Sequence, residues 1–176
     1  IAEVTTRETG LPTSAVPWVL ACLGVGMTIG NFLGGWATDR HATRTVTWGF
    51  SAFILALLAY TQFASSPVGL VLTAFVIGIT SSALIPSIQT RLIRISDEAA
   101  LLGAAVNHAA FNIGNSLGAW LGGLVIAGGF GYLAPGWVGV LLTVLGFGLA
   151  VVSVVVERRD KSRNLNTIGI PTIATE

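Results

Sequence analysis

The charged residues of this chain are confined to a few places and leave three long stretches without an ionised side chain. The stretches cover residues 9–38, 45–90 and 99–156. A helix that crosses a lipid bilayer needs about 20 predominantly apolar residues, so the first stretch holds one span and each of the others holds two. We therefore expect an all-α integral membrane protein with five transmembrane helices, at residues 15–37, 45–64, 68–90, 100–128 and 134–156.

The composition agrees with a bilayer environment, because only 10% of the residues are charged and 22 are glycine, a profile that water-soluble domains rarely show. The net charge is +1, and the basic residues are not interleaved with aromatic residues, so we expect no nucleic-acid partner. The single cysteine, Cys22, lies inside the first span and cannot form a disulfide or a thiolate cluster within one chain. We expect neither a metal site nor a cofactor.

Basic residues occur at alternate ends of the predicted spans. Arg40 and Arg44 follow the first span, Arg91 and Arg94 follow the third, and four more follow the last: Arg158, Arg159, Lys161 and Arg163. The two intervening loops carry no Lys or Arg. By the positive-inside rule, the arginine-bearing loops and the C-terminus are cytoplasmic, as in a multi-pass protein of the inner or plasma membrane.

The expected external N-terminus needs an explanation. Residues 1–14 contain neither an initiating Met nor an apolar signal region, so we interpret them as an external loop at the end of a preceding segment. The chain is then expected to be a fragment of a longer protein. The alternative is a mature protein from which a leader has been removed.

Turn-forming and capping residues predict the helix ends. Breaks are expected at residues 65–67 and 128–131, where Ser, Pro and Gly gather. Ser14 is expected to cap the first span, with Pro17 in its first turn. Residues 157–176 are first basic and then rich in Asn, Thr and Pro, which predicts a disordered cytoplasmic tail.

A segment of the first span recurs in the fourth. Residues 29–36 (IGNFLGGW) and 113–120 (IGNSLGAW) are identical at six of eight positions. The two spans are three helices apart and so cross the membrane in opposite directions, as in the inverted three-helix repeats of many transporters. Residues 15–64 are then the last two helices of an incomplete repeat, and residues 65–156 form a complete one.

Glycines recur at every fourth residue in the same two spans. The first span has Gly26, Gly30 and Gly34, and the fourth has Gly114, Gly118 and Gly122. Such ridges let neighbouring helix backbones approach closely, so we expect these glycines to pack helices rather than to bind a ligand.

The fourth span also carries four polar residues, Asn107, His108, Asn112 and Asn115. At 100° per residue, the last three fall within a sector of roughly 60°. Polar groups are costly in hydrocarbon, so this face is expected to line a cavity or the bundle interior. His108 is either a proton-relay group or an interhelical hydrogen-bond donor.

Other chemistry finds little support in the sequence. Pro86 predicts a kink in the third span, and no span contains a carboxylate, so an acidic proton-coupling residue would lie elsewhere in the protein. The nucleophile-elbow, zinc-protease and P-loop motifs are absent from the sequence. We do not expect an enzyme.

Residues 34–44 (GGWATDRHATR) resemble the Gly-x-x-x-Asp-Arg loop motif of the major facilitator superfamily, in the copy found in the C-terminal half. Gly35, Asp39, Arg40 and Arg44 match, whereas Ala42 and Thr43 replace a glycine and a basic residue. Residues 107–123 and 131–135 are similar to the eleventh helix and following loop of drug:proton antiporters, of the arabinose-efflux and chloramphenicol-resistance-like group.

The resemblance implies a twelve-helix protein of which these are the last five helices. It would be a proton-coupled exporter of small molecules, of drug or sugar type, that works by alternating access together with its N-terminal half. Asp39 and Arg40 would act as a conformational switch at the cytoplasmic face. The alternative is a non-transporting membrane module for binding or assembly.

Overall fold

The computed structural model describes residues 1–96 and 99–167, and all regular elements in that part of the chain are helical. Two short turns come first, a π-helical turn at Val4–Glu8 and a 3-10 turn at Thr13–Ala15. Four long helices follow: α1 (Val16–Phe63), α2 (Pro67–Ser96), α3 (Ala100–Ala127) and α4 (Ala134–Thr167). Each is long and apolar enough to cross a membrane. The prediction of an all-α membrane bundle is confirmed.

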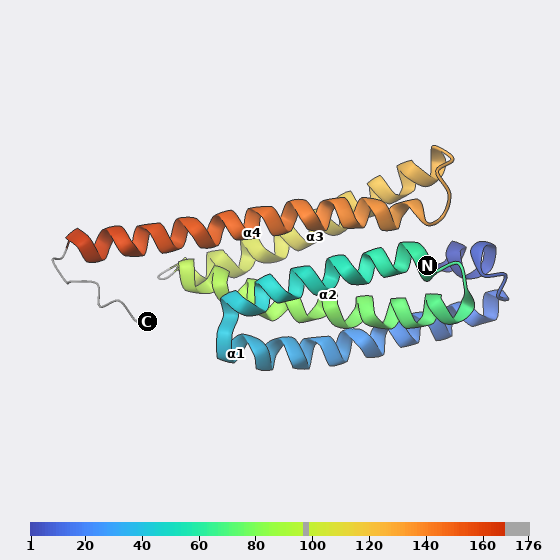
Figure 1. Cartoon of the computed structure of the whole chain (residues 1–176), viewed down its shortest axis with the longest axis horizontal. Helices are drawn as coiled ribbons and strands as arrows, with labels where there is room; N and C mark the ends of the chain where they lie inside the picture. Colours follow the sequence, from blue (N-terminus) through green and yellow to red (C-terminus); the bar gives the residue numbers. More distant parts are fainter. Residues whose placement is uncertain (97–98, 168–176) are drawn as a thin grey trace.

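Helix α1 contains two spans because it folds back on itself at His41. This residue leaves the helical conformation (φ −150°, ψ 72°), and the chain reverses its direction there (Figure 1). We call residues 16–40 the first arm and residues 42–63 the second arm. The predicted seven-residue connection at 38–44 is therefore wrong in its length, since a single non-helical residue makes the turn.

The connections between α1 and α2 and between α3 and α4 contain the Ser and Gly residues at which breaks were predicted. The Ser66 hydroxyl accepts a hydrogen bond from the Gly69 amide (3.1 Å) at the start of α2. Between α3 and α4, Gly129 and Gly131 have φ values of 81° and 88°, which side chains rarely tolerate. Ser14, by contrast, does not cap α1, because Ala15 occupies the capping position and makes no side-chain cap.

Successive spans alternate in direction, and the bundle therefore has two distinct ends (Figure 1). One end carries the His41 turn, the end of α2, the start of α3 and the end of α4. The other carries Val4–Glu8, the connection between α1 and α2, and the loop between α3 and α4. Arg40, Arg44 and Arg91 belong to the first end, as the count of basic residues predicted.

The N-terminal segment packs onto the bundle instead of forming a free loop. Val4 is buried together with Val19, Ala64, Leu70 and Ala74. Beside Val4, the fully buried Thr5 donates a hydrogen bond to the carbonyl of Ile1 (3.0 Å). The segment thus covers the start of the first arm, the end of the second arm and the start of α2.

A charged group of this segment also reaches the loop between α3 and α4. The Arg7 guanidinium lies 5.5 Å from the ring centre of Tyr132. A hydrogen bond from Arg7 Nε to the Glu3 carboxylate (2.6 Å) raises the pKa of Arg7 above its usual value. The cation–π contact thereby links the N-terminal segment to the second half of the chain.

The helices are unequally covered. The first arm of α1 packs along α2, and the second arm contacts α4, where the rings of Phe50 and Phe147 lie 5.7 Å apart. Helix α3 is the most open, with Leu101, Ile113 and Trp120 each more than half exposed. Helix α4 continues to Thr167, past the predicted span end at residue 156, and residues 168–176 of the predicted tail lie outside the described residues.

Candidate functional site

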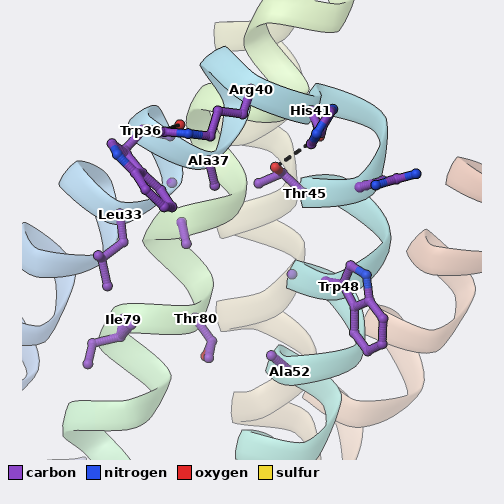
Figure 2. Close-up of a pocket in the computed structure, with 14 residues that line it drawn as sticks. Leu33, Trp36, Ala37, Arg40, His41, Thr45, Trp48, Ala52, Ile79 and Thr80 are labelled. Atoms are coloured by element: carbon purple, nitrogen blue, oxygen red, sulfur yellow. Dashed lines mark hydrogen bonds between the residues drawn. The ribbon is translucent and has the colours of Figure 1, made fainter.

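The loop-motif residues flank the His41 turn in sequence, and Figure 2 shows Arg40 and His41 at this turn. Asp39 and Arg40 end the first arm, and Arg44 lies in the first turn of the second arm. The Asp39 carboxylate is exposed and forms no ion pair with any described residue. Arg40 donates a hydrogen bond to the Trp36 carbonyl (3.4 Å), and its guanidinium lies 3.8 Å from the centre of the Trp36 ring. A Cβ at Gly35 would meet no atom within 4 Å, so this glycine makes no close packing contact.

A groove of about 440 Å³ lies between the two arms of α1 and helix α2. Arg40, His41 and Arg44 are among its lining residues, together with Trp36 and Trp48. The remaining lining residues are mostly small or apolar: Leu33, Gly34, Ala37, Thr45, Gly49, Ala52, Ile79, Thr80 and Ala83. This groove is not predicted from the sequence, although two tryptophans beside an arginine-rich turn are a recognisable signal of it.

The glycine ridge of the first arm lies directly against the backbone of α2. Gly26, Gly30 and Gly34 are buried. A Cβ added to any of them would collide with a backbone carbonyl oxygen of α2, at Phe75, Ile79 and Ala83 respectively. The two backbones therefore approach as closely as glycine permits.

The corresponding ridge of α3 has different surroundings. At Gly114 and Gly118, an added Cβ would meet nothing within 4 Å, and at Gly122 the nearest atom is Cβ of Pro135 at 3.5 Å. No helix in the described part of the chain packs closely against Gly114 and Gly118. The close helix packing expected at these two glycines is therefore not found among the described residues.

The structure divides the four polar residues of α3 into two groups. Asn107 is buried and, with Asn115, lines a hollow of about 270 Å³ beside Ile88 of α2 and Phe111. His108 and Asn112 are exposed and do not line this hollow. The shared helical face therefore does not form a single cavity wall within the described chain.

These groups offer hydrogen bonds and positive charge. Among the described residues, no three His, Cys, Asp or Glu side chains are placed to hold a metal ion. The amides of Asn107 and Asn115 can donate and accept hydrogen bonds, and the arginines of the turn carry fixed charge. Such groups suit recognition and conformational control.

The two repeated segments lie on helices that run in opposite directions, the first arm of α1 and helix α3 (Figure 1). Together with the apolar spans, this arrangement defines a multi-pass helical membrane protein. The family model described as Major Facilitator Superfamily matches residues 1–176. The chain belongs to this family, and the predicted resemblance is confirmed.

The chain is also similar to proteins of Escherichia coli and Bacillus subtilis. The chain is 36% identical over 143 residues to the inner membrane transport protein YdhP of Escherichia coli, an alignment that covers 81% of the chain and 36% of YdhP. It is 29% identical to the uncharacterized MFS-type transporter YfhI of Bacillus subtilis, over 91% of the chain and 40% of YfhI. It is also 29% identical to the putative transporter AraJ of E. coli, over 70% of the chain and 32% of AraJ.

The chain thus spans about two fifths or less of the length of these relatives. No solved structure matches it.

Proposed function

We propose that the intact protein is a secondary active transporter that moves a small molecule across the membrane by alternating access. The observation that carries this proposal is the inverted pair of spans, the first arm of α1 and helix α3, in a chain of the Major Facilitator Superfamily. Inverted repeats allow one helical unit to rock against another around a fixed site. Residues 15–64 and 65–156 supply one incomplete and one complete repeat of this kind.

More specifically, we propose that the intact protein exports small molecules of drug or sugar type and that proton movement drives this export. This proposal is supported by the resemblance of residues 107–123 and 131–135 to drug:proton antiporters, together with the resemblance of residues 34–44 to the loop motif of the superfamily. No described span contains a carboxylate inside its apolar stretch, so the acidic group that binds the coupling proton lies in the N-terminal half of the intact protein.

Asp39 is proposed to hold one conformation closed at the cytoplasmic face. Its carboxylate is exposed and makes no ion pair with a described residue, so it is free to pair with a helix N-terminus or a basic loop of the other half. The glycine contact between the first arm and α2 supports this role, because it fixes the turn to a rigid helix pair.

The polar face of α3 is proposed to border the substrate pathway. Asn107 and Asn115 line the hollow beside α2, while His108 and Asn112 extend the polar surface into the region that the described chain leaves open. Polar residues at membrane depth are expected to face protein or a water-filled cavity rather than lipid.

A transport assay with an Asp39 variant tests the proposal. The intact gene is expressed in cells that lack their own efflux pumps, and the cells are screened for retention of amphipathic dyes and sugars with and without a protonophore. We expect proton-dependent export by the wild type, and a decrease of about tenfold or more in Asp39→Asn, since a hydrogen bond to a charged group contributes about 1.5–3 kcal/mol and about 1.4 kcal/mol corresponds to a factor of ten. Asp39→Glu should keep most of the export.

The amount of each variant in the membrane is measured in parallel. If Asp39→Asn exports as well as the wild type at equal expression, the switch role is wrong. If the wild type exports no compound of either class, the alternative of a non-transporting membrane module becomes the better account.

A further inference from the structure

The groove at the His41 turn has a positively charged rim without a matching carboxylate. Arg40, His41 and Arg44 line it, and no Asp or Glu is among its lining residues. The contacts of Arg40 are with the carbonyl and the ring of Trp36, neither of which carries a charge. Arg44 is exposed and has no ion pair with a described residue. Two arginines at one mouth attract an anion.

Below this rim the groove is apolar. Leu33 and Ala37 line it from the first arm, Ala52 from the second arm, and Ile79 and Ala83 from α2 (Figure 2). Small side chains at several of these positions leave the hollow open, with a volume of about 440 Å³. The floor suits a hydrocarbon chain rather than a hydrated ion.

The two tryptophans place the rim at the level of the lipid headgroups. Trp36 and Trp48 line the groove and are 61% and 74% exposed. Tryptophan is enriched at the boundary between headgroups and acyl chains. The rim lies where α1 turns back between two spans, as a headgroup site requires.

We propose that this groove binds an anionic phospholipid. The phosphate lies between Arg40 and Arg44, and the start of an acyl chain runs along Leu33, Ala52 and Ile79. Basic pockets between membrane spans recognise anionic headgroups in this way. A free phosphate would leave the apolar floor unfilled, and an apolar helix of another protein would leave the arginines without a counter-charge.

Lipid retention by the intact protein tests this site without reference to transport. The protein is purified from vesicles that contain equal amounts of phosphatidylglycerol and phosphatidylcholine, delipidated stepwise, and analysed by native mass spectrometry. We expect the wild type to retain phosphatidylglycerol preferentially. In the double variant Arg40→Gln/Arg44→Gln, retention should decrease about thirtyfold, as expected for two basic contacts.

Two further variants separate the groove from general surface charge. Arg158→Gln/Arg159→Gln removes the same charge from the sequence after the last span and should keep the lipid. Ala52→Phe fills the apolar floor, keeps both arginines, and should release the lipid. Inorganic phosphate in excess should not displace phosphatidylglycerol, because it lacks the acyl chain.

Each of the following results would overturn the proposal: equal retention of the two lipids, unchanged retention in the double arginine variant, or an equal loss in the Arg158/Arg159 control. Unchanged retention in Ala52→Phe, displacement by inorganic phosphate, or failure of the wild type to retain any lipid would overturn it as well.

Discussion

Gly30 and Gly114 occupy the same position in the repeated segment, but only Gly30 lies against another helix. A Cβ at Gly30 would collide with the backbone of Ile79, whereas a Cβ at Gly114 would meet no described atom within 4 Å. We expect Gly30→Ala to lower the free energy of unfolding by about 1–3 kcal/mol, because the backbones of α1 and α2 must separate. Thermal unfolding in detergent, followed by tryptophan fluorescence, measures this loss.

Gly114→Ala is the matched control, because it makes the same change at the equivalent position of α3. In this chain it should leave the unfolding temperature nearly unchanged. A Gly30→Ala protein as stable as the wild type would contradict the close contact between the first arm and α2.

Residue spacing alone predicted which side chains share a helical face but not what that face contacts. The ridge at Gly26, Gly30 and Gly34 cannot be distinguished by spacing from the one on α3, since both repeat every four residues. Similarly, helical periodicity predicted that His108, Asn112 and Asn115 share one face of α3. The hollow beside α2, however, is lined by Asn107 and Asn115. Whether a face is buried depends on which helix packs against it, and residue spacing within one helix does not reveal that neighbour.

At the scale of elements, the N-terminal segment stabilises one end of the bundle. Val4 is 2% exposed and packs in the cluster with Val19 and Leu70. We expect Val4→Asp to destabilise the protein by about 3–5 kcal/mol, the usual result of an uncompensated buried charge. Ala2→Asp, at an exposed position of the same segment, should have little effect. Equal unfolding temperatures for the two variants would show that the segment is not packed as described.

The sequence located most helix ends because their physical signals are strong. Ser66 and Pro67 mark the start of α2, and Gly129 and Gly131 adopt the positive φ values of the last turn. The reversal at His41 has no such signal, because residues 36–48 contain neither Gly nor Pro and are compatible with a helix. The packing of residues 1–14 was missed for a related reason, since a short polar segment shows no clear periodicity.

Among the described residues, α3 is the helix least covered by other parts of the protein. Its apolar side chains Leu101, Ile113 and Trp120 are exposed, and its glycines at 114 and 118 have no close neighbour. In a bilayer such a face contacts lipid or further helices. The polar groups at His108 and Asn112 favour further helices, which the proposed N-terminal half would provide.

At the scale of the whole molecule, the five spans form a bundle with the basic turns at one end and the packed N-terminal segment at the other (Figure 1). We propose, from the positive-inside rule, that the basic end faces the cytoplasm. Asp39, the arginine-rimmed groove and the end of α4 lie at this end, where a conformational change of the proposed transporter would open or close its inner mouth.

We propose that these five spans are the last five of a twelve-helix transporter, and sequencing the DNA immediately upstream of the codon for Ile1 tests this. We expect an open reading frame that continues upstream and encodes about seven more apolar spans, each of about 20 residues. A start codon directly before Ile1, or a cleavable signal sequence there, would contradict the claim and favour a five-span membrane module.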